Sequence, residues 1–268
     1  MAISNGFKMH VEFKNKLRNS CLVLVFGFTT IVYGASTADD YYNKGNLESK
    51  RKHYIEAISD YTKAIKINPQ YAKAYNNRGL ANLNILNLSQ SLSDFNKAIQ
   101  YDSELAVAYF NRGVLYRKRN NLNRSIADFT QAIRINPNDA GVYRNRGIAY
   151  GIKGKFNEAI LDFTKSIQID PNQAEGFYNR GVIYQQQENF IQSISDYSRT
   201  IEINPSYSKT YIKRAFDYFK LEQYKEAWED IKKAKSLGYK FNGNDSKFLD
   251  SLKKKSDKFK YEVTGKIL

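Results

Sequence analysis

Large apolar side chains recur with a period of 34 residues between residues 38 and 241. The units are 38–71, 72–105, 106–139, 140–173, 174–207 and 208–241. Position 4 of the units is Tyr41, Tyr75, Tyr109, Tyr143, Phe177 and Tyr211, and position 24 is Tyr61, Phe95, Phe129, Phe163, Tyr197 and Ile231. Positions 20 and 27 are small throughout. Because small residues facing large ones let two helices pack closely, each unit is predicted to form a helical hairpin.

Prolines and turn residues predict where the helices end. All four prolines fall at position 32, namely Pro69, Pro137, Pro171 and Pro205. Proline cannot continue a helix, and it pushes the preceding residue out of the α region. The segments 120–123 and 154–157 contain Asn or Gly, which suit a tight turn. We therefore expect a first helix over positions 2–14 of each unit and a second over positions 18–31.

A polar triplet, Asn-Arg-Gly, occupies positions 6–8 at 77–79, 111–113, 145–147 and 179–181. Glycine inside a helix costs about 1 kcal/mol relative to alanine, so its recurrence indicates a close approach of two helices. Together with the aromatic, small and proline positions above, this pattern resembles the tetratricopeptide (TPR) repeat over residues 38–241. The resemblance implies an all-α fold, a right-handed α-solenoid of six hairpins that binds peptides or partner proteins in a concave groove.

Two units depart from the pattern. The second has Asn82 at position 11 and Ser103 where proline is expected, so it is expected to be looser. The sixth has Ala215 for glycine and Tyr239 for proline, which is typical of an end unit. Beyond it, residues 242–268 are predicted to form a capping helix, with Leu252 on its apolar face, and a Lys-rich tail.

Bases at position 7 and acids at position 23 recur in step. The predicted structural ion pairs are Arg78 with Asp94, Arg112 with Asp128, Arg146 with Asp162, and Arg180 with Asp196. A partly buried pair within each hairpin would fix the register of its two helices. The alternative is an exposed row of arginines that binds acidic ligands.

Position 6 carries asparagine in the first five units and Lys213 in the sixth. The resemblance implies that position 6 faces the groove, where an amide offers a donor and an acceptor to a peptide backbone. Aromatic residues at position 5 add apolar anchors. The predicted peptide-groove residues are Asn77, Asn111, Asn145, Asn179, Phe110 and Tyr178. The alternative is that asparagine is simply common at this position of the repeat.

The N-terminal segment has the order of an export signal. Basic residues at 14–18 precede an apolar run over 21–33, and small residues follow at 34–38. We expect a signal peptide over 1–34 and a periplasmic or secreted protein, with cleavage after Gly34, Ala35 or Ala38 all open. An uncleaved membrane anchor is the alternative, although the run is shorter than the roughly 20 residues of a spanning helix. The only cysteine is Cys21, so the remaining chain has no disulfide.

The net charge of +15 lies mostly at the ends of the chain. Residues 232–268 alone contain eleven lysines and four acids. The Lys-rich end indicates either a solvated helix terminus or a contact with an anionic envelope surface, lipid or polymer.

Catalytic chemistry is not indicated. The two histidines, His10 and His53, are far apart in sequence, and no phosphate-binding glycine loop or nucleophile with a matching base is recognisable. We expect no enzyme activity, no metal, no cofactor and no nucleic-acid partner. The expected function is a scaffold for protein or peptide partners in the envelope or outside the cell. The alternative is an envelope-associated structural protein that uses its Lys-rich end.

Overall fold

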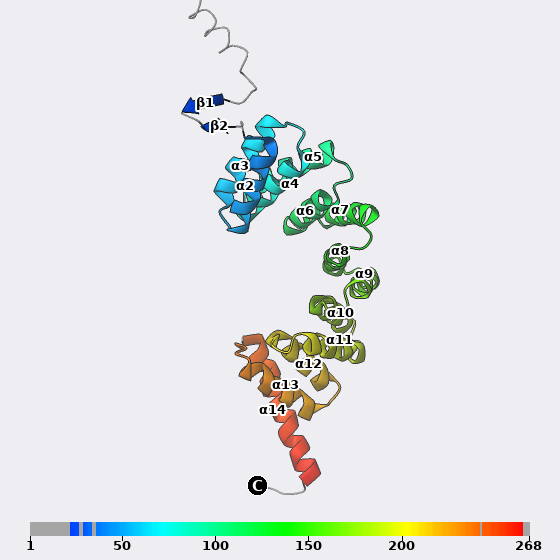
Figure 1. Cartoon of the computed structure of the whole chain (residues 1–268). Helices are drawn as coiled ribbons and strands as arrows, with labels where there is room; N and C mark the ends of the chain where they lie inside the picture. Colours follow the sequence, from blue (N-terminus) through cyan, green and yellow to red (C-terminus); the bar gives the residue numbers. More distant parts are fainter. Residues whose placement is uncertain (1–21, 27–28, 34–35, 242, 265–268) are drawn as a thin grey trace, which may run out of the picture. The chain divides into compact units, whose positions relative to one another are not determined.

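The computed structural model describes residues 22–26, 29–33, 36–241 and 243–264 (Figure 1). The predicted basic region, Cys21, and the candidate cleavage residues Gly34 and Ala35 lie outside the described residues. The chain divides into two compact units, Met1–Ser103 and Glu104–Leu268.

The first described residues of the N-terminal unit form a β-hairpin that the sequence pattern did not predict. Strands β1 (Leu22–Phe26) and β2 (Thr29–Tyr33) pair antiparallel, with Leu22 opposite Tyr33. Their residues are largely β-branched or aromatic, which favours strands. Within the described part of the chain, no helix is long and apolar enough to cross a membrane.

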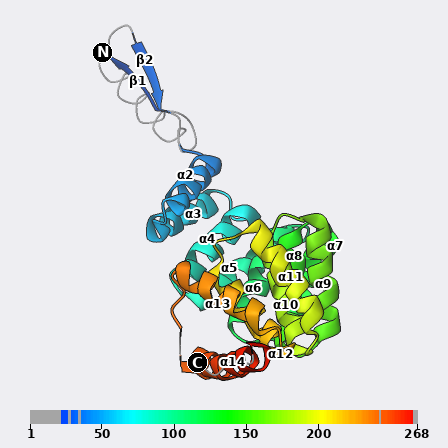
Figure 2. The same cartoon turned by 90° about the horizontal axis from the view of Figure 1, so that it is seen from below.

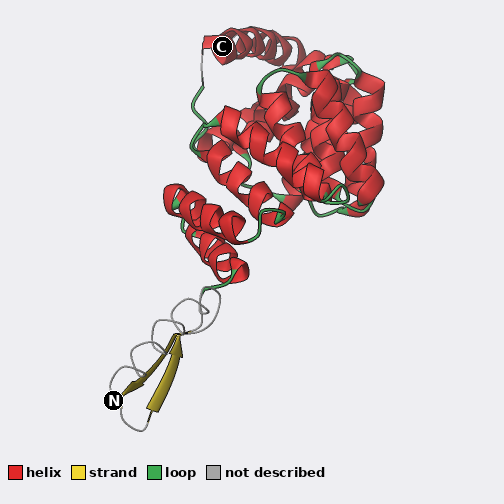
Figure 3. Ribbon diagram, turned by 90° about the horizontal axis from the view of Figure 1, so that it is seen from above, coloured by secondary structure: helices red, strands yellow, loops and turns green. Residues whose placement is uncertain are grey.

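From residue 38 onward the described residues form helices joined by short loops (Figure 3). The N-terminal unit contains α2 (Ala38–Lys50), α3 (Tyr54–Ile67), α4 (Ala72–Asn84) and α5 (Leu88–Tyr101). The C-terminal unit contains α6 (Ala106–Lys118), α7 (Leu122–Ile135), α8 (Ala140–Ile152), α9 (Phe156–Ile169), α10 (Ala174–Gln186), α11 (Phe190–Ile203), α12 (Ser208–Lys220), α13 (Tyr224–Ser236) and α14 (Gly243–Thr264).

Two helices form each repeat, and they begin at positions 1 and 17, one residue earlier than predicted. We call the even-numbered helices α2 to α12 the A helices and the odd-numbered helices α3 to α13 the B helices. Each A helix packs against the B helix that follows it, and α7, α9 and α11 also pack against the next A helix (Figure 2). The predicted helical-hairpin solenoid is confirmed, with the β-hairpin as its one addition among the described residues.

The turn between the A and B helices requires a left-handed residue. Position 15 has positive φ in all six repeats, at Lys52, Leu86, Asn120, Gly154, Glu188 and Glu222. The residue after it closes the turn, because its N–H donates to a carbonyl five residues earlier, as from Lys155 to Tyr150 at 2.9 Å. Only Gly154 and Asn120 suit this conformation, which explains why the turn is visible in the sequence of those two repeats alone.

Glycine at position 8 lies against the aromatic ring at position 24. A Cβ atom built on Gly113 would lie 2.8 Å from Cε1 of Phe129, whose side chain is fully buried. The sixth repeat shows the compensating pair, because Ala215 replaces the glycine and Ile231 replaces the aromatic ring. Position 8 therefore has to be small because of the ring that it faces.

We expect Gly113→Ala to lower the free energy of unfolding by about 1–3 kcal/mol, because overpacking outweighs the gain in helix propensity. Adding Phe129→Ile should recover part of this loss, as the sixth repeat does naturally. Urea unfolding of the two single variants and the double variant measures the coupling. Strictly additive effects of the two substitutions would show that the ring does not set the size of residue 113.

Candidate functional site

The arginines at position 7 lie within hydrogen-bonding distance of the aspartates at position 23. Nε and NH2 of Arg146 donate to the two carboxylate oxygens of Asp162, both at 2.8 Å. The same two-bond geometry joins Arg78 to Asp94, Arg112 to Asp128, Arg180 to Asp196 and Arg214 to Asp230. The first repeat has a weaker version, with Lys44 Nζ 3.5 Å from Asp60.

A third contact of these arginines, not predicted from the sequence, joins neighbouring repeats. NH1 of Arg146 donates to the hydroxyl of Thr130, which lies at position 25 of the preceding repeat, at 3.0 Å. Arg78, Arg180 and Arg214 make the equivalent bond to Thr62, Thr164 and Ser198. The recurrent hydroxyl at position 25 was the signal available in the sequence.

Aromatic rings cover the guanidinium groups. The Cζ atom of Arg146 lies 5.7 Å from the ring of Tyr143 and 5.9 Å from that of Tyr150, within the range of cation–π attraction. The arginine side chains of the four predicted pairs are only 15–19% exposed. Their guanidinium N–H groups are used in contacts within the fold, so the arginines do not form an exposed row that could bind acidic ligands.

The asparagines predicted to line a groove differ in their surroundings. Nδ2 of Asn77 donates to Asn46 at 2.8 Å and to the hydroxyl of Tyr42 at 3.1 Å. Asn111 is buried, at 6% exposure.

Asn145 is held by two neighbours, because Nδ2 donates to the carbonyl of Gly141 and Oδ1 accepts from Arg117. The side chain of Asn179 is half-buried and lines a hollow beside apolar side chains, so its amide is the one best placed to meet a ligand.

The predicted aromatic anchors lie on A helices of the C-terminal unit. Phe110 borders a hollow of about 300 Å³ between α6 and α8, together with Val142. Tyr178 packs on Tyr207, with ring centroids 5.1 Å apart, and burial raises the pKa of its hydroxyl to about 12. Both rings are half-buried, so each combines a packing role with a partly accessible face.

A second hollow, of about 180 Å³, lies between α8 and α10. Asn179 lines it beside the apolar side chains of Ile148 and Val182. An amide among apolar walls can hold a peptide group while a side chain of the peptide enters the hollow.

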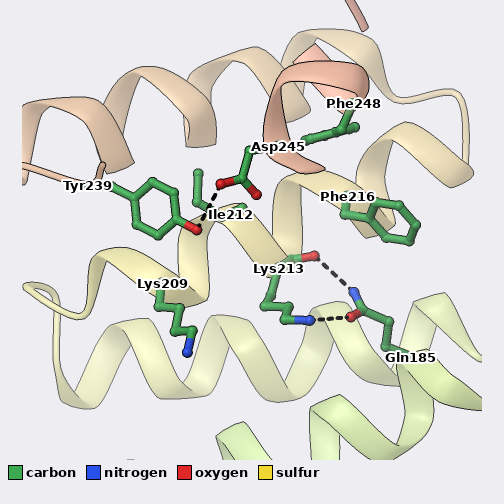
Figure 4. A pocket seen from close by; sticks show the side chains of 8 residues that line it. All are labelled: Gln185, Lys209, Ile212, Lys213, Phe216, Tyr239, Asp245 and Phe248. Carbon is green, nitrogen blue, oxygen red and sulfur yellow. Dashed lines mark hydrogen bonds between the residues drawn. The ribbon is translucent and has the colours of Figure 1, made fainter. Parts of the chain in front are cut away.

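The third hollow along the A helices is the largest of the three, at about 390 Å³. It is formed by α10, α12, the segment that follows α13, and α14 (Figure 4). We call it the C-terminal pocket. Its lining residues are Gln185, Lys209, Ile212, Lys213, Phe216, Tyr239, Asp245 and Phe248. It combines two ammonium groups with three apolar side chains, a combination that suits an anionic group next to an apolar one.

Helix α14 is held against the last repeat by apolar contacts. Leu252 is fully buried, and the ring of Phe248 lies 5.7 Å from that of Phe216 and 5.4 Å from that of Phe219. The Tyr239 hydroxyl donates to the Asp245 carboxylate at 3.2 Å (Figure 4). These contacts place α14 as one wall of the C-terminal pocket.

Lys213 is the most constrained cation of the pocket. Its Nζ donates to Oε1 of Gln185 at 3.2 Å, and Nε2 of Gln185 donates back to the Lys213 carbonyl at 3.2 Å. Burial lowers the pKa of the Lys213 ammonium, and Asp217 opposes that shift. In the sequence, Lys213 was visible only as the residue that breaks the asparagine row.

Behind the pocket lies a buried acid, Asp217, which the sequence analysis did not single out. Its side chain is fully buried, Oδ1 accepts from Nε2 of Gln185 at 2.5 Å, and Oδ2 has no hydrogen-bond partner among the described residues. Burial raises the pKa of its carboxyl to about 6. The signal was available, because position 10 is apolar in the other repeats, at Leu47, Ala81, Leu115, Ala149 and Ile183.

The described residues contain no cluster of His, Cys, Asp or Glu that could hold a metal ion. The recurrent acids at position 23 face arginines instead. The arrangement as a whole offers hydrogen bonds, cations and apolar hollows for binding.

Family models and solved structures agree with this geometry. A model described as Tetratricopeptide repeat matches residues 38–71, 106–139 and 174–207, a second of that description matches 129–160, and one described as TPR repeat matches 152–188. Together they span about half of the chain. No curated protein matches this sequence.

Three solved structures illustrate the likeness of fold. PilF of Pseudomonas aeruginosa is 18% identical, with a TM-score of 0.65 and coverage of 75% of this chain and 88% of its own. YrrB, described as a TPR protein with an unusual peptide-binding site, is 20% identical, with a TM-score of 0.57 and coverage of 66% and 91%. MamA of Desulfovibrio magneticus is 16% identical, with a TM-score of 0.59 and coverage of 65% and 98%.

At these identities the structures show a shared fold and nothing of function. The repeat period, the packed helical hairpins and the family matches lead to one assignment: the chain belongs to the tetratricopeptide repeat family.

Proposed function

We propose that this protein is a scaffold that binds peptides or partner proteins along the A helices of its C-terminal unit. The observation that carries the proposal is a series of three hollows, between α6 and α8, between α8 and α10, and among α10, α12 and α14. Each has apolar walls, and position 6 contributes a polar side chain to the second and third, namely Asn179 and Lys213.

Successive hollows suit an extended chain better than one compact metabolite. A peptide presents an apolar side chain and an amide at regular intervals, which is what apolar hollows with polar edges can bind. The peptide-binding site in the description of YrrB belongs to YrrB, and it lends this proposal support by analogy of fold only.

We further propose an envelope or extracellular location, which the order of basic, apolar and small residues over 1–38 supports. The competing function is contact with an anionic surface. It is favoured by Lys253, Lys254 and Lys255, whose side chains are exposed on α14.

A variant that fills the second hollow tests the scaffold function. We expect Val182→Glu to abolish most of the binding that the full chain shows to an immobilised library of ten-residue peptides, because a carboxylate would occupy the apolar wall beside Asn179. Leu161→Glu makes the same kind of change on α9, where the side chain is 69% exposed, and should leave binding intact.

Circular dichroism of the two variants checks that their helical content is equal. An unchanged set of bound peptides with Val182→Glu would contradict a role for this hollow. Retention on anionic vesicles that is lost in high salt and insensitive to Val182→Glu would instead support the surface-contact function.

A further inference from the structure

Three groups connect the interior of the last two repeats to the C-terminal pocket. Asp217 accepts a hydrogen bond from Gln185. Gln185 in turn accepts one from Lys213, whose ammonium lines the pocket (Figure 4). Gln185 lies on α10, while Asp217 and Lys213 lie one turn apart on α12. One amide side chain therefore joins a buried acid to a cation that a ligand can reach.

The acid is poorly accommodated where it lies. One of its oxygens, Oδ2, has no hydrogen-bond partner among the described residues, and the side chain is 0% exposed. The hydroxyl of Tyr197, which faces Asp217 from α11, is also buried without a partner in the described part of the chain. A carboxylate in such a place is costly when ionised, because neither water nor a direct cation stabilises its charge.

The charged and titratable groups around Asp217 are few. Lys213 faces it from its own helix, Tyr197 faces it from α11, and α10 contributes the uncharged Gln185. From α14, Asp245 acts on Lys213 rather than on Asp217. When Asp217 is ionised, the carboxylates of Asp217 and Asp245 balance the ammonium groups of Lys209 and Lys213. When Asp217 is protonated, these four groups together carry one positive charge.

We infer that the protonation state of Asp217 controls how strongly the C-terminal pocket binds an anionic segment of a peptide. The inference rests on the proposed peptide-binding function and assigns regulation to one of its sites. When Asp217 is ionised, its field opposes the attraction between Lys213 and a ligand carboxylate. When Asp217 is protonated, that opposition disappears and the peptide binds more tightly.

The direction of the effect follows from the burial described above, which raises the pKa of Asp217 to about 6. Peptide aspartates, with ordinary pKa values near 3.9, stay mostly ionised at pH 5.2. Any protonation of the peptide in acid weakens binding, so tighter binding at low pH has to come from the protein.

The test uses the full chain and a rhodamine-labelled peptide of alternating leucine and aspartate, at constant ionic strength. Fluorescence anisotropy should give a Kd about threefold to tenfold lower at pH 5.2 than at pH 7.5, because protonation removes the negative charge of Asp217 behind the pocket. Asp217→Asn should show the lower Kd at both pH values. Asp217→Leu, which restores the apolar character of position 10, should do the same and serves if the asparagine variant folds poorly.

Two outcomes overturn the inference in different ways. Binding with the same Kd at both pH values refutes the control by Asp217 and leaves the pocket as a peptide site. No binding at either pH refutes the pocket as an anion site, while the Val182→Glu experiment still judges the scaffold function separately.

A measurement without ligand adds an independent check. The ¹³C resonance of reductively methylated Lys213 should shift with a midpoint near the titration of Asp217 in the natural chain. The same resonance should lose that step in Asp217→Asn.

Discussion

Asp162→Ala is expected to destabilise the protein by about 3–5 kcal/mol, because it leaves the guanidinium of Arg146 without its carboxylate in a buried position. Arg146 is 16% exposed and Asp162 is 7% exposed, so water cannot replace the lost partner. The contacts of Arg146 with Thr130 and Tyr143 remain, but neither carries a negative charge. Urea unfolding followed by circular dichroism measures the loss.

The same hairpin provides the control. Lys155 and Glu158 form an ion pair at 2.9 Å with side chains 50% and 43% exposed, so Glu158→Ala should destabilise the protein far less than Asp162→Ala does. A double-mutant cycle of Asp162→Ala with Arg146→Met should give an interaction energy above about 1 kcal/mol. An interaction energy near zero would mean that the pair does not stabilise the hairpin.

Asp217→Asn is expected to stabilise the protein at pH 7.5 by about 2–3 kcal/mol. The pKa of Asp217 rises from 3.8 to about 6 on folding because the side chain is buried. A shift of about two units corresponds to roughly 3 kcal/mol of penalty for the ionised form. Asparagine keeps an amide or carbonyl group near Gln185 and removes the charge.

The pH dependence has a definite sign. The folded state binds the Asp217 proton more tightly than the unfolded state, so the penalty is absent below pH 3.8 and complete above about pH 6. The stability difference between Asp217→Asn and the natural chain should therefore grow from near zero at pH 4 to its full value at pH 7. Asp250→Asn, at an exposed site on α14, should change stability by less than about 0.5 kcal/mol at either pH. A variant no more stable than the natural chain at pH 7.5 would contradict the buried-charge argument.

The helical repeats were predictable because a small residue at position 8 and a large one at position 24 recur in all six units. The small residue indicates that the large side chain packs against it, and four prolines mark where B helices end. The β-hairpin over residues 22–33 has no such repetition. Its apolar residues fit a strand as well as an export signal, and the location of the protein stays a prediction.

The sequence predicted one part of the candidate site for the same reason and could not predict the other. The spacing of Arg146 and Asp162 predicted their proximity, because it recurs in every repeat. The C-terminal pocket depends on α14, which lies outside the repeat, so the period could not place Phe248 beside Phe216. Whether an asparagine at position 6 is hydrogen-bonded also depends on neighbouring residues that vary between repeats. An example is Arg117, which donates a hydrogen bond to Asn145.

The geometry of the arginine contacts bears on how such a chain can change in length. Each charged pair lies within one repeat, whereas only an uncharged hydroxyl, such as that of Thr130, connects it to the repeat before. A gene duplication or deletion of 34 residues that keeps each hairpin whole therefore leaves every arginine–aspartate pair together, and each of these arginines loses at most a neutral hydrogen bond at a new junction. The arginine–aspartate pairs therefore tolerate changes in the number of whole repeats, while a deletion that ends inside a hairpin would separate an arginine from its aspartate.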